Sequence, residues 1–287
     1  MITLDFDPGN RLRATQSATV PFVYLDQWAY ISLAKDPQQL QRLVDAIVRL
    51  DGTLAFSVFN FFELSQVSDL EQLRRIENLF QQIWPRVAFL NSDPTEVISS
   101  EDEILRGTSN QAPHLDDWML NKYVELYRPG VNPLDPKGFL LHLQTPGFAE
   151  GFRTAYRLLA ERMKTAFRKM RRMYQIDENA KTEVTSLSKG EPIPRPTRYI
   201  FEQAVYSVVK DNLNIHNPNH FTDFFHMVVP LSYCDLVLLD KGWAERARQV
   251  QNSVRIVGLL THDAAVFSAK TLDQFWVAIE RFSPSIA

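Results

Sequence analysis

Short apolar runs alternate with helically spaced apolar stripes along the first ninety residues. The runs PFVYLD (21–26), TLAFS (53–57) and VAFL (87–90) have the length and composition of buried strands. Between them, residues 38–50 and 69–84 place their apolar side chains on one face at helical spacing. This alternation predicts a parallel sheet with right-handed crossovers, and it makes 21–26 the first structured segment that we expect.

The same alternation returns near the end of the chain. Residues 220–234 begin as a helix, for which Thr222 is the expected N-cap. The run LVLLD (236–240) resembles the first strand, because it is short, apolar and ends in an acid. Residues 253–260 (SVRIVGLL) are a candidate fifth strand, and 271–282 form a final amphipathic helix.

The middle of the chain differs from both ends. Residues 91–220 contain helical patterns and no convincing strand, so we expect a helical insertion there. Residues 22–90 and 221–287 would form the core of a three-layer α/β/α domain. The insertion is divided in charge, because 91–150 carries 4 basic and 10 acidic side chains, whereas 151–210 carries 13 basic and 6 acidic.

The basic part of this insertion contains one amphipathic helical stretch, residues 153–172, with eight Arg or Lys and one Glu. Such a stretch suits contact with the phosphates of a nucleic-acid strand. We therefore expect nucleic acid to bind at Arg168, Lys169, Arg171 and Arg172. The alternatives are a solvated basic face, a face neutralised by the acidic half, or a surface for a membrane or a protein partner.

Composition excludes several classes of protein. The 287 residues include one cysteine, Cys234, which excludes a disulfide framework and a multi-cysteine zinc site. The chain has no apolar run long enough to span a bilayer, and its N-terminus lacks the order of a signal peptide, so we expect a cytoplasmic protein without membrane contact. The net charge of −3 argues against general coating of nucleic acid. The absence of a phosphate-binding glycine loop argues against a kinase or a dehydrogenase.

Four carboxylates fall where parallel strands end or where neighbouring helices begin. Asp26 and Asp240 follow predicted strands, Glu63 lies in the first turns of the helix after the second strand, and Asp223 lies near the start of a helix. Ligands of open parallel sheets bind outside the carboxyl ends of the strands. Carboxylates gathered there need cations, and oxygen ligands select Mg²⁺ or Mn²⁺. Such a site suits metal-assisted phosphodiester hydrolysis.

Some of these acids also have a structural interpretation. Asp26 has the position of an N-cap, and Asp223 has that of an acid that stabilises a helix start. Asp235 precedes its strand and is better explained as structural, whereas Asp263 follows the candidate fifth strand and rivals Asp240. His226 lies one turn after Asp223 and can face the same cleft, although a packed or surface histidine is the commoner case.

Three stretches carry a resemblance to a known family. VYLDQWAYISLA, AFSVFNFFELSQ and TDFFHMVVPLSYCDLVLLDKGW resemble the PIN-domain ribonucleases, in particular the larger bacterial PIN-like type. The resemblance covers the outer segments only, and residue by residue it maps the family's acids onto Asp26, Glu63, Asp223 and Asp240. It implies a three-layer fold with a central parallel sheet, divalent-metal cleavage of single-stranded RNA, and frequent self-association.

The sequence departs from the family pattern after the fourth strand. The family form is Thr-x-Asp, where this chain has Leu238, Leu239 and Asp240, and a closer match is the tripeptide that ends at Asp263. We retain Asp240, because Asp223 and its helix lead directly into that strand.

The expected function is therefore a divalent-metal-dependent endonuclease. RNA is favoured by the resemblance, although the residues themselves do not separate RNA from single-stranded DNA. The alternative is a non-catalytic PIN-like scaffold that binds nucleic acid or a protein partner through the insertion at 91–220. A homo-oligomer is a further expectation from the resemblance.

Overall fold

The computed structural model describes residues 2–6, 12–125, 140, 146–176, 196–210 and 219–283. Its centre is a five-stranded parallel sheet with the order β5-β4-β3-β6-β7. The strands are β3 (Phe22–Leu25), β4 (Thr53–Ser57), β5 (Val87–Leu90), β6 (Leu236–Leu238) and β7 (Ala265–Phe267). Because the chain winds outward from β3 to β5 and then returns to β6, the order reverses between β3 and β6, as in doubly wound folds.

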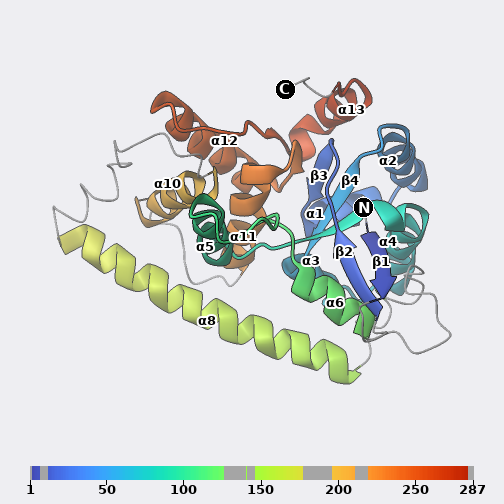
Figure 1. Cartoon of the computed structure of the whole chain (residues 1–287), viewed down its shortest axis with the longest axis horizontal. Helices are drawn as coiled ribbons and strands as arrows, with labels where there is room; N and C mark the ends of the chain where they lie inside the picture. The colour runs from blue at the N-terminus through green and yellow to red at the C-terminus, as the bar shows by residue number, and fades with distance from the viewer. Residues whose placement is uncertain are drawn as a thin grey trace.

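Helices cover both faces of this sheet, as Figure 1 shows, so the fold is α/β with three layers. Successive strand residues point to opposite faces, so that Val23 and Leu25 join one buried cluster while Phe22 and Tyr24 join the other. The helices packed in the first cluster include α1 (Gln27–Leu33), α2 (Pro37–Arg49), α4 (Leu70–Ile83) and α13 (Leu272–Glu280). The helices packed in the second are α5 (Pro94–Leu105), α8 (Pro146–Ile176), α10 (Pro196–Lys210), α11 (Asn219–Tyr233) and α12 (Lys241–Ile256).

Helix α3 (Val58–Leu64) lies between the layers at the carboxyl end of β4. Its Phe59 and Phe62 belong to the second cluster, whereas Phe61 and Leu64 belong to the first. The helix begins after Ser57, whose side chain forms a reciprocal capping box with that of Asn60. Both sides of this short helix are therefore anchored, which fixes the direction of the side chains that it carries.

An N-terminal hairpin corrects the expectation that the structure begins at 21–26. Strands β1 (Ile2–Phe6) and β2 (Leu12–Gln16) pair antiparallel, and β2 contacts α6 (Asp117–Glu125). The amide of Gln16 accepts from the N–H of Phe89 at 2.7 Å and donates to its carbonyl at 3.3 Å. The hairpin thus satisfies backbone groups of the edge strand β5, which is one way in which proteins protect a sheet edge.

The expectation of a strand at 253–260 is wrong. Helix α12 continues to Ile256, and the fifth strand is β7, further along the chain. Ala247, Val250 and Val254 are buried at helical spacing, whereas Ile256 is 85% exposed. Gly258 follows at a φ of 74°, a left-handed conformation that glycine adopts without strain. The apolar run is therefore a helix end and a turn.

The expected N-cap at Thr222 is also wrong, because α11 begins at Asn219 and Thr222 is buried inside its first turns. Elsewhere the helix positions agree with the periodicity. Short 3₁₀ turns, η1 (Trp84–Arg86) and η2 (Ala269–Thr271), precede β5 and α13.

Of the described helices of 91–220, α5, α8 and α10 pack on the second face of the sheet, whereas α6 places Leu120 in the first cluster. Tyr199, Ile200 and Ala204 of α10 share a buried cluster with Tyr24 of β3, and α10 contacts both α11 and α12. Residues 126–139, 141–145, 177–195 and 211–218 of this segment lie outside the described residues. Among the described helices, none combines the length and apolar character that a bilayer crossing requires.

Candidate active site

Asp26 and Asp240 lie next to each other at the carboxyl edge of the sheet. Asp26 follows β3 and Asp240 lies two residues beyond β6, and these two strands are hydrogen-bonded neighbours. The N–H of Asp26 donates to the carbonyl of Leu238 at 3.1 Å, and the N–H of Asp240 donates to Oδ2 of Asp26 at 2.7 Å. They therefore occupy the point where the strand order reverses, which is the usual ligand site of open α/β sheets.

Both residues are also helix N-caps. Oδ1 of Asp26 accepts from the N–H of Ala29 at 2.9 Å, at the start of α1. Oδ1 of Asp240 accepts from the N–H of Gly242 at 2.6 Å and from that of Trp243 at 3.1 Å, at the start of α12. The cap interpretation of Asp26 is confirmed, and the positive ends of two helices face these carboxylates.

Glu63 reaches the same edge from α3. Asn60 of this helix donates to the carbonyl of Leu25, the last residue of β3, at 3.0 Å. The side chain of Gln27, next to Asp26, donates to the carbonyl of Glu63 at 2.8 Å. Oε2 of Glu63 lies 2.8 Å from Nε2 of His226, and the Glu63 side chain is only 13% exposed.

His226 and Tyr24 are the site residues that the sequence did not assign. His226 lies in α11 one turn after Asp223, and its Nδ1 is hydrogen-bonded to the hydroxyl of Tyr24 in β3. The His226 side chain is 1% exposed and Tyr24 is fully buried. Two signals were present: the helical spacing of His226 from Asp223, and the strand alternation that turns Tyr24 toward the α11 side.

The charges of the acids act on one another, which places the four in one electrostatic cluster. The pKa of Asp223 is raised to about 8, mainly by burial; His226 lowers it, and the charges of Asp240, Glu63 and Asp26 add to the rise. Burial also raises the pKa of Asp26 to about 7, although His226 and two backbone N–H groups counteract part of the shift.

His226 is the basic group within this cluster. Its burial alone would lower the pKa of the imidazole, but the carboxylates of Glu63, Asp26 and Asp223 raise that pKa above its ordinary value. A protonated His226 thus offsets part of the negative charge that four buried or half-buried acids concentrate at one sheet edge.

The donor chemistry fits a hard divalent cation. Asp26, Glu63, Asp223 and Asp240 supply oxygen ligands from four separate elements. Burial raises the pKa values of Asp26 and Asp223, and a cation bound beside them would favour their charged forms. Within the described part of the chain, however, no three His, Cys, Asp or Glu side chains already stand together as a metal-ligand group. Binding of a shared ion therefore requires some of these side chains to turn toward one another.

Asp235 and Asp263 lie away from the four acids. Oδ2 of Asp235 accepts from the N–H of Phe22 at 2.6 Å, so Asp235 fixes the amino end of β3, as its position before β6 indicated. Asp263 precedes β7 and forms a bidentate pair with Arg255 at 2.7 Å, with a side chain that is 59% exposed. The expectation that Asp263 follows a strand was wrong, because that strand is a helix end.

The basic stretch at 153–172 lies within α8, the long helix along the lower side of Figure 1. Phe167 anchors it, because this side chain is 1% exposed, stacks on Phe221 of α11 at a centroid distance of 5.6 Å and contacts Phe224 edge-to-face at 5.4 Å. Phe221 and Phe224 flank Asp223, so the anchor lies beside the acid cluster. Helix α8 also contacts α3, the helix of Glu63.

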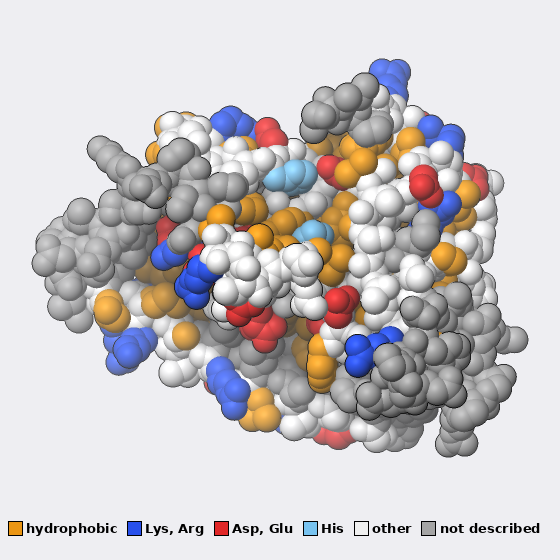
Figure 2. Space-filling model, in the orientation of Figure 1, with side chains coloured by type: hydrophobic (Ala, Val, Ile, Leu, Met, Phe, Trp, Pro, Cys, Tyr) orange, Lys and Arg blue, Asp and Glu red, His pale blue; other side chains and the backbone are white. Residues whose placement is uncertain are grey.

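The four basic residues of this stretch differ in their surroundings. Arg168, Lys169 and Arg172 are exposed, and Figure 2 shows Lys and Arg side chains along the lower left of the molecule, where α8 runs. Arg171 is half-buried and donates to the carbonyl of Val208 in α10 at 3.2 Å. Arg171 therefore has a structural contact within the protein.

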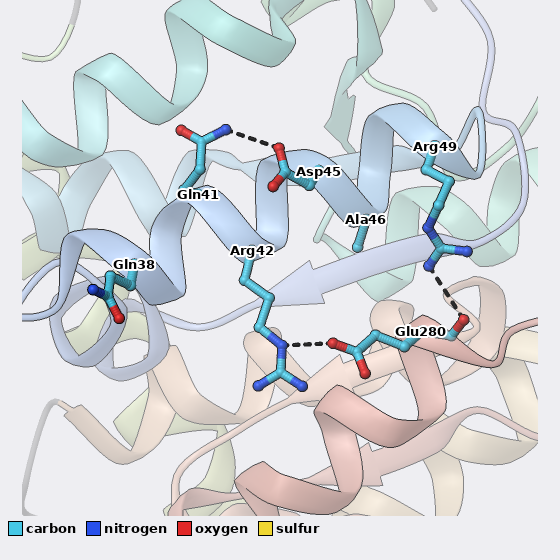
Figure 3. A pocket seen from close by; sticks show the side chains of 7 residues that line it. All are labelled: Gln38, Gln41, Arg42, Asp45, Ala46, Arg49 and Glu280. Carbon is cyan, nitrogen blue, oxygen red and sulfur yellow. Dashed lines mark hydrogen bonds and ion pairs between the residues drawn. The ribbon is translucent and has the colours of Figure 1, made fainter.

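A separate surface hollow of about 430 Å³ lies between α2 and α13. Figure 3 shows Arg42 paired with the carboxylate of Glu280 at 2.6 Å, while Arg49 donates to its carbonyl at 3.2 Å. The two cationic groups are thus occupied by one residue of the protein. This hollow belongs to the first face of the sheet and contains none of the four acids.

Fold and site together define a doubly wound α/β protein in which two central strands and the helices α3 and α11 bring carboxylates and a buried histidine to one edge of the sheet. Comparison of the chain with protein-family models, with curated proteins and with solved structures found no match.

Proposed function

We propose that this protein is a PIN-like, divalent-metal-dependent endonuclease that hydrolyses phosphodiester bonds, with single-stranded RNA as the favoured substrate. The observation that supports the proposal most directly is the contact between the N–H of Asp240 and Oδ2 of Asp26 at 2.7 Å. It joins the two acid-bearing strand ends at the point where the strand order reverses. The family resemblance of the sequence supplies the preference for RNA.

Asp26, Glu63, Asp223 and Asp240 would hold Mg²⁺ or Mn²⁺ in this proposal. Such an ion, when bound, activates water and compensates charge on the transferring phosphate. The caps formed by Asp26 and Asp240 keep their carboxylates fixed relative to the sheet. The His226 contact restricts Glu63 in the same way. These contacts thus limit, without preventing, the rotation of the side chains that binding of a shared ion requires.

The exposed cations of α8 would contact the substrate strand. Phosphates are read by Arg and Lys without base preference, so Arg168, Lys169 and Arg172 would hold many sequences alike. The anchor at Phe167 supports this assignment, because it brings the basic helix next to Asp223. Arg171 belongs to the same stretch, and its contact with Val208 holds α8 on α10.

Incubation of the purified protein with end-labelled RNA and single-stranded DNA tests the activity. Each substrate is incubated with Mg²⁺, with Mn²⁺ and with EDTA. We expect RNA fragments with either ion and intact RNA with EDTA. Cleavage that persists in EDTA would contradict the proposed metal dependence, and intact RNA under all conditions would contradict the nuclease.

A non-catalytic scaffold is the alternative, and one observation favours it. The carboxylates of Asp26 and Asp240 already serve as helix caps, and among the described residues no three ligands are gathered as a metal group. In that case α8 would bind nucleic acid, a partner protein or a second copy of the chain. Retention of labelled RNA in EDTA, without cleavage in Mn²⁺, would identify this function.

A further inference from the structure

A continuous chain of buried polar groups leads from the sheet to Glu63. Oγ of Ser57 lies 3.1 Å from Oδ1 of Asn60 and 3.1 Å from the hydroxyl of Tyr24. That hydroxyl contacts Nδ1 of His226, and Nε2 of His226 contacts Oε2 of Glu63 at 2.8 Å. The chain thus connects β4, β3, α11 and α3 in one network, and buried networks of this kind restrict the orientation of their members.

The two nitrogens of His226 face in different directions. Nδ1 faces the sheet through Tyr24, and Nε2 faces Glu63, so the ring is held at one end and holds a carboxylate at the other. Oε1 of Glu63 has no hydrogen-bond partner among the described residues. Of the two carboxylate oxygens, Oε1 is therefore the one available to a cation at the acid cluster.

We propose that Tyr24 and His226 are positioning residues, which orient the Glu63 carboxylate so that it serves as a ligand for a divalent cation. This inference rests on the proposed function. It goes beyond the four acids, because it assigns a role to two buried residues that touch neither substrate nor metal. Partners of this kind typically change metal affinity by about 10- to 100-fold when they are removed.

Two substitutions of His226 separate the two contacts. In His226→Gln the amide nitrogen takes roughly the place of Nε2 and keeps a donor toward Glu63. In His226→Asn it takes roughly the place of Nδ1, so the contact with Tyr24 is kept and that with Glu63 is lost. Tyr24→Phe keeps the aromatic ring and removes the hydroxyl that holds His226.

Calorimetric titration with Mn²⁺ alone measures the effect without reference to cleavage. We expect His226→Asn to weaken Mn²⁺ affinity about tenfold, with a smaller loss for Tyr24→Phe, whereas His226→Gln stays within about threefold of the unmodified protein. Ser232→Ala is the matched control, because Ser232 is a buried residue of α11 whose hydroxyl donates to Val228 within the helix. Thermal melts establish that each variant is folded. If His226→Asn does not fold, the Mn²⁺ affinity of Tyr24→Phe tests the positioning role in its place.

A double variant tests whether His226 acts through Glu63. In a Glu63→Gln background, His226→Asn should cause no further loss of Mn²⁺ affinity. A further tenfold loss would overturn the positioning role, as would equal affinities of Asn and Gln variants that both fold. Failure of the unmodified protein to bind Mn²⁺ would overturn the nuclease proposal and this inference together. Normal Mn²⁺ affinity in all variants would overturn this inference alone.

Discussion

The backbone N–H of Asp240 donates to the Oδ2 atom of Asp26 at 2.7 Å, across 214 residues of sequence. This bond joins the loop after β6 to the loop after β3, and each of the two residues caps the helix that follows it. Loss of either carboxylate therefore affects the charge of the site and the local backbone at once, so experiments must separate these effects.

Asp26→Asn should abolish most cleavage while the fold is kept. An amide supplies less charge to a divalent ion than a carboxylate does. Loss of a residue that only supports a metal ligand lowers activity by up to about 100-fold, so loss of a ligand itself should lower activity by at least that much. The lost hydrogen bond from Asp240 costs about 1 kcal/mol, which relief of repulsion among the acids partly offsets. Cleavage assays and thermal melts measure both effects. Asp36→Asn is the control, because it makes the same change at the N-cap of α2.

Stability without metal should fall as the pH rises from about 4 to 8. Asp26 and Asp223 have folded-state pKa values of about 7 and 8, above their ordinary values, so the folded state keeps protons that the unfolded chain has already released. The free energy of unfolding therefore decreases with pH through this window. The raised pKa of His226 acts in the same direction.

Thermal melts in EDTA at pH 5 and pH 8.5 measure this dependence. We expect a lower melting temperature at pH 8.5, and Asp223→Asn should reduce the difference, because it removes one of the two titrating acids. Melting temperatures that rise steadily over this range would contradict the raised pKa values.

Phe167→Ala should destabilise the protein by about 3 kcal/mol, as expected when a buried phenylalanine is truncated. Phe167 is 1% exposed and packs α8 on Phe221 and Phe224. Leu158→Ala is the matched control in the same helix, because Leu158 is 59% exposed and its loss should change stability by less than about 0.5 kcal/mol. Urea denaturation of both variants distinguishes an anchored helix from one that packs loosely.

Replacement of Arg168, Lys169 and Arg172 by Gln should weaken the binding of all RNA sequences alike. Each lost phosphate contact removes up to about 0.7 from the slope of log affinity against log salt, so the slope should change by about 2. Lys35, Arg74 and Lys270, which are exposed and lie outside α8, provide a control triple with the same loss of charge. An unchanged salt slope with a lowered melting temperature would indicate that this face of α8 packs within the protein.

Asp240→Asn and Asp263→Asn should differ in their effect on cleavage. Asp240 lies at the carboxyl edge beside Asp26, whereas Asp263 lies before β7 and is paired with Arg255. We expect at least a tenfold loss of activity for Asp240→Asn, by the same argument from metal affinity, and none for Asp263→Asn. Equal losses in the two variants, measured on the same labelled RNA, would refute the choice of Asp240.

Local signals in the sequence were sufficient for most elements of the sheet. The short apolar runs at β3, β4, β5 and β6 are buried on both faces, so they are recognisable without knowledge of their partners. The acids at strand ends follow from the same signal, since an acid directly after a buried strand must reach the sheet edge. Whether these acids bind metal stays a prediction.

Other features depended on contacts between distant residues. The run at 253–260 has the apolar content of a strand, and only the packing of Val250 and Val254 within the second cluster identifies it as the end of α12. The N-terminal hairpin is likewise held by Gln16 on Phe89, 73 residues away.

The sequence by itself determined four strands of the central sheet (β3 to β6), the main helices and the order of the acids, because strand length and helical periodicity depend on neighbours a few residues apart. Only the tertiary structure decided that His226 lies between Tyr24 and Glu63, which are 202 and 163 residues distant. The hydrogen-bond partners of this buried imidazole are determined by how α11 packs against β3 and α3. The physical reason is that hydrogen bonds of a buried side chain are set by which elements pack together, and a single chain's local pattern does not contain that information.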